Sequence, residues 1–216
     1  MAELTEGKYA GEFIASEANG TRSRETVTIL SGENVVAGEV LGKVTVAAAV
    51  GAAVAGNTGN GTITAAPTVG AGTKPGVYRA TCVEPGTNVG EFIVEDPDGI
   101  TLGVAVVAVA FTGGGLTFTI ADGATDFASG DAFTITVAAG SGKYAAFDQD
   151  GTDGRQVAAG IAYDNYDATS ADVTGVIIAR DAEVNANEIS WPSDIETAEQ
   201  TAAETQLAAL GIFVRA

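Results

Sequence analysis

Alternation of apolar and polar positions is the main pattern along the chain, and it predicts many short strands. In residues 26–30, Val27 and Ile29 fall on one side and Thr26 and Thr28 on the other, as in a half-buried strand. The same kind of pattern recurs at residues 40–46, 62–64, 77–83, 91–95, 103–111, 116–120 and 132–137. Glycine- and proline-containing turns separate these segments. Several short strands without a helical period predict a small antiparallel β-sandwich or barrel.

The last third of the chain combines a buried core with the one good helix signal. Residues 154–192 contain an apolar segment, a β-branched run at residues 173–178 and a closing Trp-Pro pair. We expect its apolar residues to form a structural scaffold: Val157, Ile161, Ile177, Trp191 and Pro192. A helix is predicted over residues 194–210, with an S-x-x-E capping box from Ser193 to Glu196 and Gly211 at its C-terminal end. The fold class is therefore mainly β or α+β, with a C-terminal helix.

The first 24 residues lack a core period. Tyr9, Phe13 and Ile14 are scattered apolar points in a polar, glycine-bearing segment. Residues 1–24 are predicted to be an arm, either flexible or ordered only on a partner. The alternative is a frayed terminus without a role.

A change in composition predicts an inserted domain. Residues 47–61 are almost all small, and a composition like that of residues 25–46 returns only after residues 140–142. We expect a core at residues 25–46 and 143–216, interrupted by an antiparallel β domain at residues 47–142. An insertion requires its two junctions to lie close together, so residues 44–46 and 143–145 should pair.

Charge and composition exclude several classes of function. The 216 residues carry a net charge of −18, which repels nucleic acids and anionic membrane surfaces. There is no histidine, so histidine-dependent catalysis and histidine zinc sites are excluded, and the single cysteine, Cys82, fits a buried thiol in a strand. The sequence shows neither a membrane-length apolar run nor a signal peptide, and we expect a soluble protein made in a cytoplasm.

Two loops have a composition that suggests a ligand-binding site, but neither matches the sequence pattern that such a site requires. Residues 148–154 place Asp148, Asp150 and Asp153 near glycines, but the spacing departs from a calcium loop and its twelfth position is Ala159. An acidic turn is the favoured interpretation. Residues 70–76 suggest a phosphate loop, but no helix follows them. We therefore expect no enzyme, no cofactor and no metal.

The two outer segments together resemble the lambda-type head decoration protein family of tailed bacteriophages. The matching pieces, in order, are SRETVTILSG (residues 23–32), AGEVLGK (37–43), DGRQVAAGI (153–161), GVIIARDAEVN (175–185), WP (191–192) and LAALGI (207–212). They cover a little over half of the chain. The compact family members join residues 42–43 directly to residues near 143–144, so the inserted β domain is a departure from the family.

The resemblance implies a structural virion protein. Members of the family are homotrimers that bind the outer surface of the expanded capsid at threefold positions and stabilise it against the pressure of packaged DNA. The expected partners are a second and third copy of the chain and the major capsid protein. The arm is expected to order on the capsid, which makes Tyr9, Phe13 and Ile14 candidate capsid contacts and the scaffold residues candidates for the trimer.

The role of the insert does not follow from the resemblance. An alternative function is an adhesion or glycan-binding β module, displayed on a virion or cell surface, that recognises a host-surface ligand. A hydrolase using acidic residues is a third class, and no pocket in the sequence pattern points to it.

Overall fold

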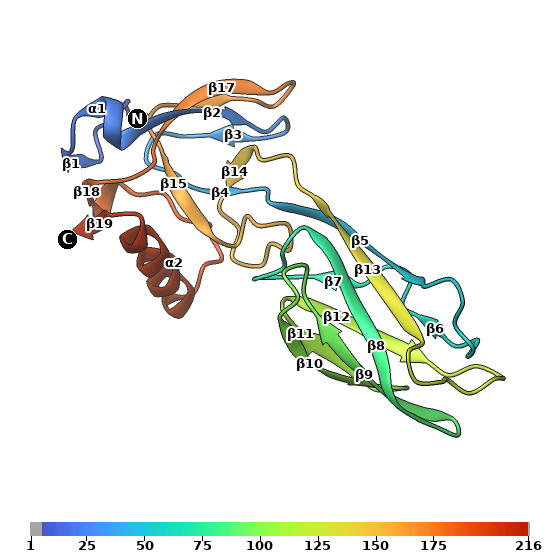
Figure 1. Cartoon of the computed structure of the whole chain (residues 1–216). Coiled ribbons are helices and arrows are strands. Elements are labelled where there is room, and N and C mark those ends of the chain that lie inside the picture. Colours follow the sequence, from blue (N-terminus) through green and yellow to red (C-terminus); the bar gives the residue numbers. More distant parts are fainter. Residues whose placement is uncertain (1–5, 216) are drawn as a thin grey trace. The chain divides into compact units, whose positions relative to one another are not determined.

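The computed structural model describes residues 6–215, and it is mainly β with one C-terminal helix (Figure 1). The predicted fold class is confirmed. The chain forms two compact units. The core unit comprises the chain up to Val44 and from Gly142 onward, and the inserted unit is Thr45–Ser141.

The core unit is built around a small closed barrel. Its strands follow the order β14 (Tyr144–Ala146), β2 (Arg24–Ile29), β17 (Val173–Ile178), β15 (Ala158–Ala162) and β4 (Val40–Lys43), and a two-stranded ribbon pairs β3 (Asn34–Val35) with β16 (Tyr166–Asp167). Adjacent residues of β4 and β17 enter two different apolar clusters, so Leu41 and Ile177 belong to one and Val40 and Ile178 to the other. Gly42 lets the backbone of residue 155 approach, because a Cβ there would lie 2.3 Å from the Arg155 carbonyl oxygen.

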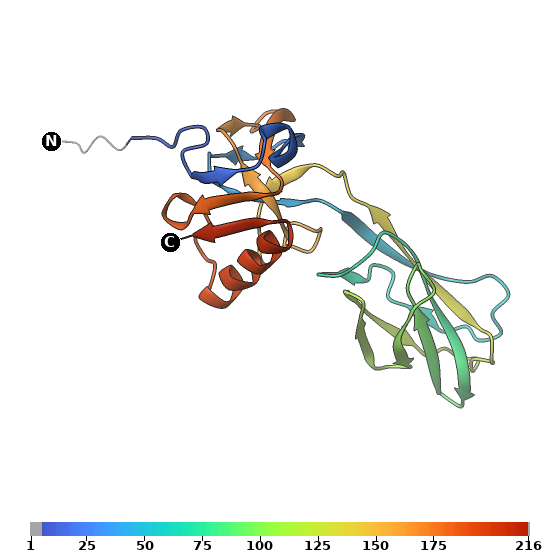
Figure 2. The same ribbon diagram turned by 60° about the vertical axis from the view of Figure 1, so that its left-hand side comes forward.

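A three-stranded sheet completes the core unit. It orders β1 (Ile14–Glu17), β18 (Ala182–Asn185) and β19 (Ile212–Arg215), with β1 antiparallel and β19 parallel to β18. Two short helical turns, α1 (Gly20–Ser23) and η1 (Ala186–Glu188), connect it to the rest. In Figure 2 the dark red strand β19 runs beside the helix α2 (Thr197–Ala209).

The helix starts later than its sequence predicts. The Ile195 amide donates to the Pro192 carbonyl oxygen, which makes residues 192–195 a turn, and Glu196 is the N-cap. The capping box joins Glu196 and Glu199, so the predicted box from Ser193 to Glu196 is wrong. The C-terminal prediction is confirmed, because Gly211 adopts a φ of 80° directly after the last turn.

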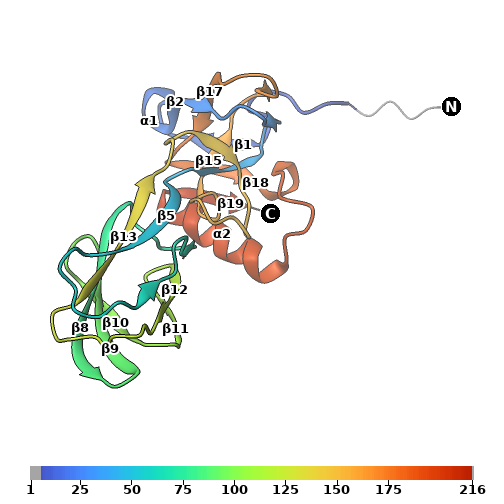
Figure 3. The ribbon, with the colours of Figure 1, turned by 90° about the vertical axis from the view of Figure 1, so that its right-hand side faces the viewer.

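The inserted unit packs two sheets over one aromatic core (Figure 3). The larger sheet orders β10 (Thr101–Val106), β9 (Val89–Glu95), β8 (Gly76–Gly86), β13 (Ala132–Ala139) and β5 (Val46–Ala53). The smaller orders β11 (Ala110–Gly113), β12 (Leu116–Ala121) and β6 (Thr62–Ile63), and β7 (Thr68–Val69) also pairs with β12. Phe92 contacts Phe127 edge to face with ring centroids 5.0 Å apart, and Phe133 packs against both.

One predicted strand and one predicted turn position in this unit are corrected. Residues 103–111 are not one strand, because the chain turns between β10 and β11 with Ala108 at a φ of 64°. Residues 84–86 are not a turn but the end of β8, and the turn falls at Asn88, which has a φ of 57°. The first part of the small-residue run, residues 47–53, lies in β5, where the neighbouring strand β13 supplies the backbone partners.

Each unit closes its own junction by backbone pairing. In the core unit the Val44 amide donates to the Lys143 oxygen, and the Gly142 amide donates to the Val44 oxygen, both at 2.9 Å. In the inserted unit the Gly140 amide donates to the Thr45 oxygen at 3.0 Å. The two ends of each unit are therefore adjacent in space. Within residues 6–215, no helix has the length and apolar character needed to cross a membrane.

Candidate functional site

The N-terminal segment is more ordered than its sequence predicts. Phe13 is fully buried in the cluster beneath α2, and Ile14 pairs with Val184 as β1 joins β18. The prediction of an arm over residues 1–24 is therefore wrong for residues 13–24; residues 1–5 lie outside the described part. The reason is physical: β1 has only four residues, too few to show a period, and it is held by pairing with β18, which is far away in the sequence.

Residues 8–12 lie on the surface of the core unit and are held by polar contacts. The Gly11 amide donates to the Tyr163 carbonyl oxygen at 2.9 Å, and Lys8 Nζ donates to the Glu188 oxygen at 2.6 Å and to Ser190 Oγ at 2.8 Å. Tyr9 is 58% exposed, and its hydroxyl donates to Glu6. Of the three predicted capsid contacts, only Tyr9 offers a largely exposed side chain.

The predicted scaffold residues take different positions. Ile161 and Ile177 are fully buried, and the half-buried Trp191 meets Phe147 edge to face at 6.3 Å between centroids. Pro192 lies in the turn before α2. Val157 lies just before β15, and its side chain is 45% exposed. Of the predicted scaffold residues, Ile161 and Ile177 thus lie in the core and Val157 lies at the surface. The role of the scaffold residues in a trimer stays a prediction.

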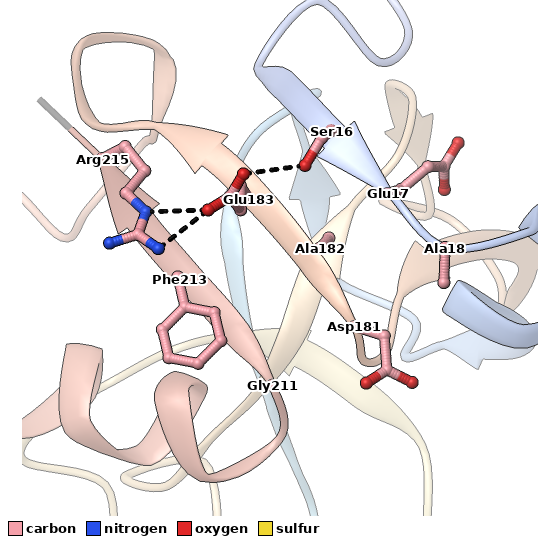
Figure 4. A pocket seen from close by; sticks show the side chains of 9 residues that line it. All are labelled: Ser16, Glu17, Ala18, Asp181, Ala182, Glu183, Gly211, Phe213 and Arg215. Carbon is pink, nitrogen blue, oxygen red and sulfur yellow. Dashed lines mark hydrogen bonds and ion pairs between the residues drawn. The ribbon is translucent and has the colours of Figure 1, made fainter.

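The outer face of the three-stranded sheet forms a shallow pocket of about 420 Å³ (Figure 4). Ser16, Glu183 and Phe213 lie across its three strands, and Arg215 follows on β19. Glu183 accepts hydrogen bonds from Arg215 Nη2 at 2.8 Å and from Ser16 Oγ at 2.9 Å. These contacts, the guanidinium first, hold the pKa of Glu183 below its ordinary value. Arg215 also lies 5.3 Å from the centre of the Phe213 ring.

The other carboxylates of this pocket are also paired. Glu17 forms an ion pair with Arg24, which lowers the pKa of Glu17, and Asp181 pairs with Arg22 at 2.8 Å. Every carboxylate that lines the pocket thus has a cationic partner. An exposed phenylalanine with an arginine beside it has the composition that is enriched at protein interfaces.

The acidic turn at residues 148–153 makes its own internal contacts. Asp148 Oδ1 accepts the Asp150 amide, and Asp153 pairs with Arg155 at 3.1 Å. Across residues 6–215, no three side chains of His, Cys, Asp or Glu are grouped so that they could hold a metal ion.

Glu39 is a partly buried carboxylate, and its desolvation disfavours the charged form. It accepts the Val36 amide at 2.8 Å, and burial raises its pKa. A raised carboxyl pKa means that its contribution to stability is lost as the pH rises through the folded pKa. Glu39→Gln should therefore raise Tm by a few degrees at pH 7 and change it less at pH 4. Thermal melts of both proteins at the two pH values measure this; an equal shift at both would contradict it.

The inserted unit keeps all its aromatic side chains inside. Tyr78 and the five phenylalanines Phe92, Phe111, Phe118, Phe127 and Phe133 are buried. Its exposed apolar side chains are valines and one isoleucine, such as Val50, Val77 and Ile100. The glycan-binding alternative for this unit stays a hypothesis. Cys82 is buried as expected, and burial raises its pKa.

Sequence reasoning missed the surface centred on Phe213 and Arg215. The C-terminal run is a short apolar segment, and nothing in it shows that β19 would be parallel to β18 and place Phe213 outward. The alternation from Ile212 to Arg215 was the available signal: Ile212 is fully buried and Phe213 is 45% exposed.

Comparison with known proteins decides the family. Residues 3–212 match the family described as bacteriophage lambda head decoration protein D. The chain belongs to this family. The predicted resemblance is confirmed, and membership gives the protein a structural role in a phage capsid and a place on the virion. This is a family of structural phage proteins and not of enzymes.

The other comparisons add little. No curated protein matches the chain. Two crystal structures of Xanthomonas campestris FlgL are similar over 49% and 53% of this chain, with TM-scores of 0.33 and 0.32 and identities of 16% and 18%. The match spans 33% of each of those chains, and a likeness this low carries no argument about fold or function.

Proposed function

We propose that the protein is a homotrimer that binds the outer surface of the expanded phage capsid at threefold positions and stabilises it against the pressure of packaged DNA. The observation that carries this is membership of the head decoration family over residues 3–212. The proposed partners are further copies of the chain and the major capsid protein.

The core unit offers surfaces suited to this role. Residues 8–12 lie along its outside with Tyr9 exposed, and the sheet of β1, β18 and β19 presents Phe213 among paired charges. A trimer would present each weak contact three times. Once one subunit is bound, the other two bind at high effective concentration, so the trimer attaches firmly.

The experiment uses the full chain and capsids of the parent phage that lack the decoration protein. Light scattering after size exclusion should give three times the mass of the chain, 21.5 kDa. Co-sedimentation should show saturable binding to expanded capsids, and bound capsids should withstand a higher temperature before releasing DNA. A monomer without affinity for expanded capsids would contradict the proposal, and unexpanded capsids serve as the control.

A further inference from the structure

The outer face of the five-stranded sheet of the inserted unit is broad and almost free of charge. Its centre is the five-stranded part, formed by residues 76–81 of β8 and the residues paired with them across the sheet. Val50 and Val77 are exposed on this face, and alanine and threonine occupy most of its other positions. The charged residues of this part are Arg79 and Glu95.

These two charges of opposite sign lie side by side near the middle of the face. Arg79 of the central strand β8 is directly opposite Glu95 of β9. The guanidinium of Arg79 nevertheless donates from Nε to Thr81 Oγ1, at 3.2 Å. Within residues 6–215 every other arginine forms an ion pair, whereas neither Arg79 nor Glu95 belongs to one. Both charges are therefore available to a partner.

We propose that this face pairs with the same face of a second copy of the chain. A twofold axis parallel to the strands, between β8 and β9, sets β8 of each copy against β9 of the other. Arg79 of one copy then faces Glu95 of the other, and the axis repeats this contact, so two reciprocal ion pairs form. The valines and threonines around them pack as in a β-sandwich, with the sheets about 10 Å apart.

Charge is the reason for choosing a second copy as the occupant. Chains with a net charge of −18 repel each other over most of their surface, so two copies approach closely only where the local charge cancels. It cancels in the five-stranded part, Arg79 against Glu95. A basic partner would bring like charge to Arg79, and an acidic partner would bring like charge to Glu95. The reciprocal arrangement satisfies both residues.

The area and the charges beyond the five-stranded part make this a weak contact. The five strands, spaced about 4.8 Å apart and contributing about six residues each, present roughly 24 Å by 20 Å. This is smaller than a standard interface. On the hairpin of β8 and β9, Glu84 lies opposite Glu91, and these carboxylates repel their counterparts. We therefore expect pairing at millimolar chain, a concentration that neighbouring trimers on a capsid would reach. Only this occurrence on the capsid rests on the proposed function.

Charge reversal tests the reciprocal ion pairs in the full chain. In sedimentation equilibrium, the mass of the wild type should rise from its low-concentration value toward twice that value as the chain approaches millimolar concentration. Arg79→Glu and Glu95→Arg should each abolish the rise, because two copies of one variant bring like charges together. An equimolar mixture of the two variants should restore it, because each reversed charge then faces an opposite one.

Asp194→Arg is the matched control. Asp194 is exposed in the turn before α2, and its replacement changes the net charge by the same amount as Glu95→Arg, so the rise in mass should persist. A wild type without the rise, variants that keep it, or a mixture that does not regain it would each overturn the inference. Binding to decoration-free expanded capsids is measured separately. A wild type that pairs in solution and does not bind capsids would overturn the proposed function alone.

Discussion

Phe13→Ala should lower the free energy of unfolding of the core unit by about 3–5 kcal/mol. Phe13 is fully buried and packs in the cluster that includes Leu207 and Val184. Removing its ring leaves a cavity between β1, α2 and the barrel, and neighbouring elements can close only part of it. The only tryptophan of the chain, Trp191, packs against the same cluster, so its fluorescence during denaturant unfolding reports on this unit.

Tyr9→Ala is the matched control. Tyr9 is an aromatic residue of the same segment, but its ring is on the surface, and its loss should change stability by less than about 0.5 kcal/mol. If both variants were equally stable, Phe13 would belong to an unattached arm and the burial described above would not hold in solution. If Phe13→Ala is destabilised as expected, any mobile arm must end before residue 13.

The sequence predicted strands well where alternation continued long enough to be seen. Ile29 in β2 is fully buried and Val27 packs against the same cluster, as their spacing predicted. It failed where a single contact decides the structure. Ala108 adopts a left-handed conformation to let β10 turn into β11, yet alanine is not a turn residue, and Phe13 is a lone apolar residue anchored by distant elements.

The surface around Phe213 could not be predicted for a different reason. Its residues come from three strands far apart in the sequence, and only pairing of β18 with both β1 and β19 brings Ser16, Glu183 and Arg215 together. Local patterns report which residues are buried. They do not report which strand is the neighbour.

Replacing residues 45–141 with Asn-Gly should leave a folded core unit. The Gly142 amide donates to the Val44 oxygen at 2.9 Å, and this is the bond between the first and fourth residues of a two-residue hairpin turn. Asn-Gly is the preferred sequence for such a turn. The Trp191 unfolding transition should stay within a few degrees of that of the full chain, and binding to expanded capsids should persist.

The inserted unit should fold equally well without the core. It has its own aromatic core and its own junction bond from Gly140 to Thr45, so residues 45–141 alone should give a cooperative β-sheet melt by circular dichroism. A matched variant of the full chain, Phe133→Ala, should destabilise this unit by about 3–5 kcal/mol while leaving the Trp191 transition unchanged.

The outcomes of these experiments assign the two units their separate contributions. A core unit that folds and binds without residues 45–141 would place capsid attachment entirely in the barrel, the three-stranded sheet and α2. A core unit that folds and no longer binds would show that the inserted unit makes capsid contacts of its own, through exposed side chains such as Val50 and Val77. A core unit that fails to fold would contradict the independence argued from the junction bonds, because Val44 and Gly142 would then need the inserted strands to hold them together.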